Sequence, residues 1–154
     1  MTRSHARRLC AATIVLAALA SCAATAAAGP AANVVLKATL TGPYLHTTAK
    51  GAGTATITFT PTKACWKFSY HGIDKPNISG IHQVPAPPAG YHKRSVFPFT
   101  ASTSMTPGCE ALDRWGSAGP GWAKKIVANP GGYYVIVGTG RYPNGAIGGV
   151  LHRA

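Results

Sequence analysis

Five histidines after residue 30 are the side chains best suited to metal or acid–base chemistry in this chain: His46, His71, His82, His92 and His152. A catalytic copper or zinc site needs three or more converging ligands and an open position. The sequence has no His-x-His pair, and an isolated histidine is more often a surface or core residue. We therefore predict no metal site and no cofactor. His82 is the weak candidate, in case the fold brings it to His71 and His92.

The chain has only three carboxylate side chains, Asp74, Glu110 and Asp113. A glycosidase needs two of them on opposite sides of a cleft. Glu110 and Asp113 follow Cys109 closely, so the charged first turn of a helix explains them at least as well. No G-x-S-x-G elbow and no glycine-rich phosphate loop is present. We expect no catalytic residues and no enzymatic activity.

The formal net charge of +12 favours encounter with anionic surfaces such as lipid head groups, acidic polysaccharide or nucleic acid, and a solvated basic surface is the simpler alternative. Without Arg3, Arg7 and Arg8, 12 basic residues face 3 acidic ones, a net charge of +9. The longest basic runs are the pairs at 93–94 and 124–125. Because the charges are scattered and no nucleic-acid motif accompanies them, we predict no specific nucleic-acid partner.

The first 28 residues have the pattern of an export signal, a basic start followed by a short apolar stretch. That stretch is too short and alanine-rich for a permanent membrane helix. The motif LASC, residues 19–22, resembles the lipobox of bacterial lipoproteins. It predicts a signal peptide over 1–21, lipidation of Cys22, attachment to the lipid membrane, a linker over 22–32 and a domain over 33–154. The alternative is cleavage after residue 28, which would release a periplasmic or extracellular protein.

Cys65 and Cys109 are the two cysteines outside the leader, and we predict that they form a disulfide. Two cysteines in a small exported domain are most simply a disulfide. The bridge would stabilise the fold by about 4 kcal/mol through loop closure. Two buried free thiols are the alternative, and the spacing supports neither a redox pair nor a zinc site.

A candidate binding patch consists of Tyr91, Lys93, Arg94, Trp115 and Trp122. Tyrosine and tryptophan beside cations suit contact with a carbohydrate or a protein. The alternative is that Trp115 and Trp122 cover the end of a barrel and the disulfide, because large aromatic side chains are usually buried.

The segments that would position these residues have the residue patterns of β-strands. Alternation in TATITFT, residues 54–60, predicts a half-buried strand, and the Asn144-Gly145 pair predicts a closing hairpin. We predict an all-β, antiparallel, Ig-like or Greek-key sandwich or barrel with one helix of about two turns. The expected strands are 33–40, 54–60, 65–72, 78–84, 94–102, 133–139 and 146–152, and the expected helix is 122–130.

The closing stretch NPGGYYVIVGTGRYPNGAIGGVL resembles the end of CHRD domains, the modules named after chordin. Its sequence departs from the usual pattern at Ile136, Gly138 and Gly148, where the family has Asn, His and Arg. Upstream, His82 aligns with the second histidine of an A-H-I-H-x-G motif, and Gly80 replaces the first. The matching positions are Asn129, Pro130, Tyr133, Tyr134, Val135, Val137, Thr139, Tyr142, Pro143, Gly145, Ala146, Ile147, Gly149 and Leu151.

The resemblance implies an Ig-like barrel, distantly similar to copper-zinc superoxide dismutase, with no established catalytic activity. We expect a non-catalytic, exported binding or structural module of the cell envelope, anchored through Cys22. Its expected partner is an envelope protein or an anionic glycan. The alternatives are a metal-binding, dismutase-like redox protein and an adhesin for anionic polysaccharide.

Overall fold

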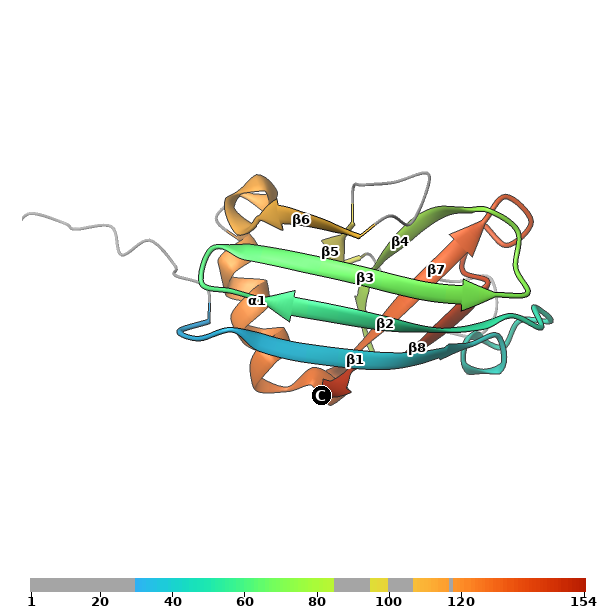
Figure 1. The fold of residues 1–154 in the computed structure, drawn as a ribbon, viewed down its shortest axis with the longest axis horizontal. Coiled ribbons are helices and arrows are strands. Elements are labelled where there is room, and N and C mark those ends of the chain that lie inside the picture. The colour runs from blue at the N-terminus through green and yellow to red at the C-terminus, as the bar shows by residue number, and fades with distance from the viewer. Residues whose placement is uncertain (1–29, 85–94, 100–106, 117) are drawn as a thin grey trace, which may run out of the picture.

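The computed structural model describes residues 30–84, 95–99, 107–116 and 118–154. These residues form one nine-stranded sheet in the order β5-β4-β7-β8-β1-β2-β3-β6, with β9 beside β1 (Figure 1). The strands are β1 (Val34–Thr41), β2 (Ala52–Phe59), β3 (Lys63–His71), β4 (Pro76–Gln83), β5 (Phe97–Pro98), β6 (Gly108–Ala111), β7 (Tyr133–Thr139), β8 (Ile147–Val150) and β9 (His152–Arg153). The helices are η1 (Pro43–Leu45), η3 (Leu112–Trp115), α1 (Ala118–Ala128) and η4 (Pro130–Gly132).

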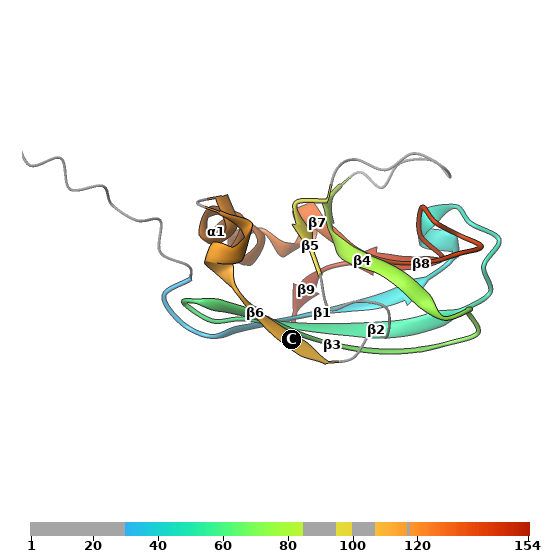
Figure 2. The same cartoon turned by 90° about the horizontal axis from the view of Figure 1, so that it is seen from above.

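The strands lie in two layers, with β1, β2, β3 and β6 in one and β4, β5, β7 and β8 in the other (Figure 2). The layers join where Thr41 of β1 pairs with Gly148 of β8. The two ends of the sheet, β5 and β6, do not pair with each other. The predicted all-β antiparallel class is therefore confirmed, and the sheet has the form of a barrel that stays open on one side.

Alternation of polar and apolar side chains explains the first layer, since one face of each strand is buried away from water. In β2, Ala55, Ile57 and Phe59 are fully buried, and threonines occupy the opposite face. In β3, Trp66 and Phe68 point into the core, and their rings contact Phe99. The core thus lies between the layers.

The helix is longer than predicted. The expectation was about two turns beginning near Trp122, whereas α1 begins at Ala118 and has 11 residues. Pro120 lies in its first turn, where a backbone N–H has no helical partner in any case. Together with η3, α1 covers one end of the barrel (Figure 1).

The expectation of a helix turn at Glu110 was wrong. Glu110 lies in β6, which the sequence pattern did not predict, whereas Asp113 does lie in the first turn of η3. The predicted strand 94–102 is seen in part. β5 pairs with β4, Val96 and Phe99 each donate a backbone hydrogen bond to β4, and residues 94 and 100–102 lie outside the described residues. Short edge strands such as these carry too few residues to show periodicity.

The closing hairpin is confirmed, but its connection is longer than a two-residue turn. Thr139 and Tyr142 exchange backbone hydrogen bonds of 3.1 Å, and the Gly145 N–H then donates to the Tyr142 carbonyl at 3.0 Å. Gly145 has a φ of 117°, whereas Asn144 is absent from the described residues with positive φ. Pro143 and Asn144 are thus the central residues of a β-turn.

Candidate functional site

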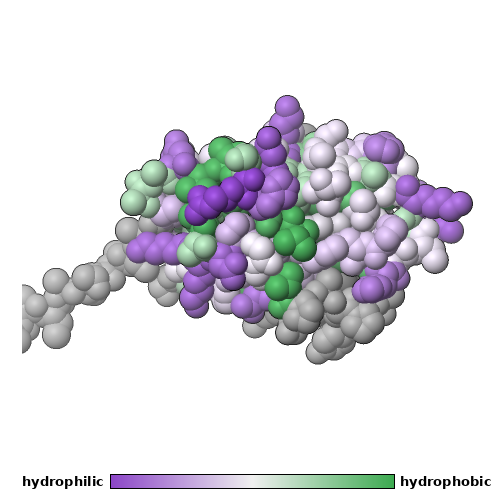
Figure 3. Space-filling view, turned by 90° about the horizontal axis from the view of Figure 1, so that it is seen from below, coloured by the Kyte–Doolittle hydropathy of each residue, from purple (hydrophilic) through white to green (hydrophobic). Residues whose placement is uncertain are grey.

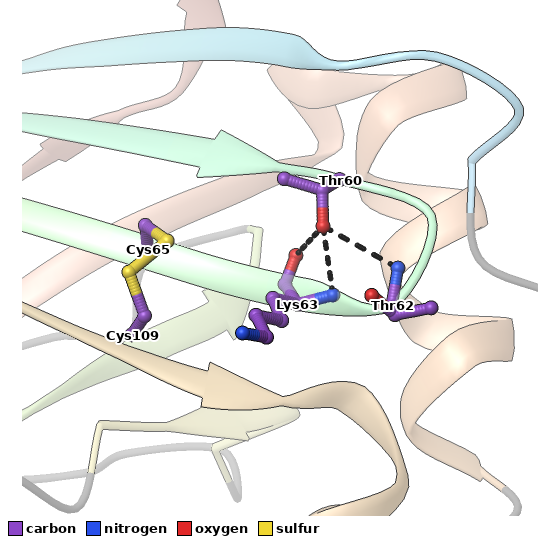
Figure 4. Close-up of a disulfide and its surroundings, with 5 residues drawn as sticks. All are labelled: Thr60, Thr62, Lys63, Cys65 and Cys109. Carbon is purple, nitrogen blue, oxygen red and sulfur yellow. Dashed lines mark hydrogen bonds between the residues drawn. A yellow bond between two sulfur atoms is a disulfide. The ribbon is translucent and has the colours of Figure 1, made fainter.

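The predicted disulfide is present between β3 and β6. Cys65 and Cys109 are register partners with an S–S distance of 2.10 Å (Figure 4). The adjoining turn is held by the Thr60 hydroxyl, which accepts hydrogen bonds from the backbone N–H groups of Thr62 at 3.3 Å and Lys63 at 2.9 Å. The bridge therefore attaches the short edge strand β6 to the sheet.

The histidines lie in different parts of the fold. His82, in β4, is 6% exposed, and its ring lies 5.5 Å from that of Tyr134. His46, His71 and His152 are exposed, and His92 lies outside the described residues. Within the described ranges, no three His, Cys, Asp or Glu side chains come close enough to share a metal ion.

The carboxylates are also separated. Asp74 lies in the loop between β3 and β4, at the end of the sheet away from α1 (Figure 1). Glu110 forms an ion pair of 3.3 Å with Arg114, and Asp113 lies in η3. Asp74 and Asp113 are exposed, whereas the Glu110 side chain is only 12% exposed and pairs with Arg114.

Trp115 and Trp122, two members of the predicted patch, border the same groove between the helical segment and β4–β5. The groove has a volume of about 660 Å³. Tyr91, Lys93 and Arg94 lie outside the described residues. The remaining groove residues are Gln83, Ser95, Val96, Pro98 and Ala118.

Packing against the core holds both indoles in place. The Trp115 ring lies 4.1 Å from Phe97, and the Trp122 ring meets Tyr133 edge-on at 6.4 Å. Both residues are only partly buried, so each indole contacts the core and also lines the groove. The two readings of the sequence, cover for the barrel end and binding patch, are therefore compatible.

Charge and hydrogen-bonding groups adjoin the indoles. The Lys125 Nζ lies 4.7 Å from the centre of the Trp122 ring, within range for a cation–π interaction. Burial raises the pKa of Tyr133, and a hydrogen bond with Gln83 partly offsets this rise. The Ser95 hydroxyl donates to the Ile81 carbonyl at 3.1 Å. The groove thus combines aromatic faces with polar groups, and a cation lies over the ring of Trp122.

A second apolar cluster, formed by Leu45, Tyr134 and Ile136, covers the opposite face of β7. Tyr134 is fully buried, and its hydroxyl has no hydrogen-bond partner among the described residues. Burial, followed by the nearby Tyr44, raises the pKa of Tyr134 to about 12. This cluster was not predicted from the sequence, although the unbroken apolar run YYVIVGT is the signal of a strand buried on both faces.

Among the described residues, no helix is both long and apolar enough to cross a membrane. The described residues instead define a disulfide-bonded, antiparallel β-domain with an aromatic groove at one end of an open barrel. The chain belongs to the CHRD domain family, whose model matches residues 32–151. No curated protein and no solved structure matches the chain.

Proposed function

We propose that this CHRD-domain protein is an exported, non-catalytic binding module of the cell envelope, which holds a glycan in the groove between Trp115 and Trp122. The proposal rests on one observation. Two half-buried indoles line the same groove as the side chains of Gln83 and Ser95. The apolar faces of sugar rings pack on aromatic side chains, while amide and hydroxyl groups bind sugar hydroxyls. Groups of this kind give a binding site its orientation and specificity.

Charge favours an anionic glycan over a neutral one. Lys125 lies over Trp122, so a sugar carboxylate or phosphate beside the indole would meet an ammonium group. The three carboxylate side chains of the protein do not line the groove. An acidic sugar would therefore enter without repulsion from the residues known to line it.

The proposal of export and membrane anchoring depends mainly on the sequence of the first 28 residues. The LASC motif supports cleavage before Cys22 and acylation of its thiol, and a disulfide suits an oxidising compartment. Acyl chains bind membranes with about 0.8 kcal/mol per buried CH₂, so two or more chains would hold the domain at the surface. In cells fed labelled palmitate, the wild type should be labelled and Cys22→Ala should not. Label that survives in Cys22→Ala would overturn the anchor.

The groove is tested by titrating the purified domain with oligogalacturonate and with chitohexaose while recording tryptophan fluorescence. We expect a saturable change with the acidic oligosaccharide, weakened at least tenfold in Trp122→Ala and partly retained in Trp122→Phe. Tyr142→Ala, in the β7–β8 loop at the other end of the sheet, is the matched control and should bind as the wild type does.

Equal binding by Trp122→Ala and the wild type, in protein shown to be folded by circular dichroism, would overturn the groove as the site. A saturable change with neither oligosaccharide would overturn the assignment to glycans. Tighter binding of chitohexaose would retain the groove and overturn the preference for acidic sugars.

A further inference from the structure

The outer face of β1, β2 and β3 is a second polar surface, separate from the tryptophan groove. The other described layer packs on the inner side of these strands, as Figure 2 shows. Strand alternation sends lysine and hydroxyl side chains outward, opposite the buried core residues. In Figure 3, hydrophilic residues project along the upper margin, on the outer side of this layer. The outward polar residues are Lys37, Thr39, Thr41, Thr54, Thr56, Thr58, Lys63, Lys67, Ser69 and His71.

Pairing registers align these side chains in rows across the sheet. Lys37 is opposite Thr56, and Thr56 is opposite Lys67. His152 of β9 extends the same row beyond Lys37. Since neighbouring strands lie about 4.8 Å apart, the two lysines stand roughly 10 Å from each other.

None of the three acidic side chains lies in this row. Of the three acidic residues, Asp74 lies in a loop, Glu110 is paired with Arg114, and Asp113 lies in η3. Neither Lys37 nor Lys67 has an ion pair in the described part of the chain. Their charges therefore add up on this face and attract polyanions.

Two shallow hollows flank the centre of the row. One, of about 300 Å³, is lined by Lys37, Thr39 and Thr56 among others, and the next, of about 320 Å³, by Thr56, Thr58 and Lys67. Thr56 lines both, so the hollows adjoin and cross from β1 to β3. An extended chain could lie over both and reach both lysines.

We propose that this face, which we name the lysine–threonine face, docks a linear acidic polysaccharide. Lys37 and Lys67 would bind its sulfate or carboxylate groups, while threonine hydroxyls between them would bind sugar hydroxyls. Single-stranded nucleic acid is less suited, since its bases stack on aromatic side chains. The aromatic residues of β3, Trp66 and Phe68, instead point into the core.

The test is a titration with size-defined heparin oligosaccharide at several salt concentrations, comparing two double variants with equal charge loss. Lys37→Gln/Lys67→Gln should bind at least tenfold more weakly and lower the slope of log K against log salt by about two. Lys50→Gln/Lys75→Gln, in loops at one end of the sheet, is the matched control and should lose less than about threefold.

Thr56→Val removes a hydroxyl while keeping the side-chain shape and strand propensity, and we expect a loss of two- to fivefold. Equal losses in the two double variants would overturn the face as the site, because they would reflect net charge alone. Competition of equal strength by single-stranded DNA of the same charge or by anionic vesicles would overturn the assignment to polysaccharide. Lys37→Gln/Lys67→Gln should keep the tryptophan-fluorescence change that oligogalacturonate produces, which separates this proposal from the groove.

Discussion

Gly149 of β8 lies directly against the backbone of Thr39 in β1. A Cβ atom on Gly149 would overlap the Thr39 carbonyl oxygen. The contact lies next to the Thr41–Gly148 pair, where the two layers of the sheet join. The close approach of these backbones therefore explains why this position of the CHRD pattern holds glycine.

Gly149→Ala should destabilise the domain by at least about 2 kcal/mol, since neither backbone can move without disturbing the junction of the layers. Urea denaturation followed by circular dichroism measures the change. Gly140→Ala is the matched control, because a Cβ there meets nothing within 4 Å. Similar midpoints for the two variants would contradict the steric argument.

Tyr134→Phe should leave stability at pH 7 unchanged or raise it by up to about 1 kcal/mol. The Tyr134 hydroxyl is buried with no hydrogen-bond partner in the described part of the chain, so its removal relieves a desolvation cost. Urea midpoints of the two proteins provide the measurement. A loss above about 1 kcal/mol would show that the hydroxyl makes a stabilising contact.

Stability should fall as the pH rises from 10 to 12. The pKa of Tyr134 is raised from 10.0 to about 12 in the folded protein, so within this window the unfolded chain loses the proton while the folded one keeps it. The unfolded state is therefore favoured progressively, by up to about 3 kcal/mol. Rapid urea titrations across this range should show a smaller decline for Tyr134→Phe. Identical declines would contradict the assignment to Tyr134.

The disulfide should contribute about 4 kcal/mol, because it closes a loop with a sequence separation of 44. Cys65→Ala/Cys109→Ala should lower the free energy of unfolding by that amount, measured without reductant. The wild type in reductant is the control and should show a similar loss. A double variant as stable as the oxidised wild type would contradict the prediction.

Two glycines of α1 should respond in opposite directions to alanine. A Cβ on Gly119 would overlap the Leu112 carbonyl, whereas one on Gly121 meets nothing within 4 Å. Gly121→Ala should stabilise the protein by about 0.5–1 kcal/mol through helix propensity, and Gly119→Ala should destabilise it. Thermal denaturation compares them, and a shift in the same direction would contradict the packing of α1 on η3.

Two departures from the CHRD closing pattern show what the sequence could not reveal. Ile136 and Gly148, which stand in place of the family's Asn and Arg, are opposite each other in β7 and β8. The Leu45 side chain packs over this pair, and a Cβ on Gly148 would come within 2.9 Å of it. In the sequence, these two changes are separate departures from the pattern. Together they make room for the second apolar cluster.

The candidate groove was predictable only in part. Trp115 and Trp122 were predicted as members of one patch, and the structure places both at one groove. The contributions of Gln83 and Ser95 were not predicted, because these residues lie about 20 to 40 positions earlier in the chain. No local pattern marks a contact made through strand pairing and helix packing.

The amino-acid sequence by itself determined the strands of β1 to β4, the closing hairpin and the Cys65–Cys109 pair, because alternation and turn chemistry act over a few residues. Only the tertiary structure decided the strand order, the short strands β5 and β6, and the alignment of Lys37 and Lys67 on either side of Thr56. These features depend on register between segments distant in the chain. Register is set by the packing of the whole core, so no single segment encodes it.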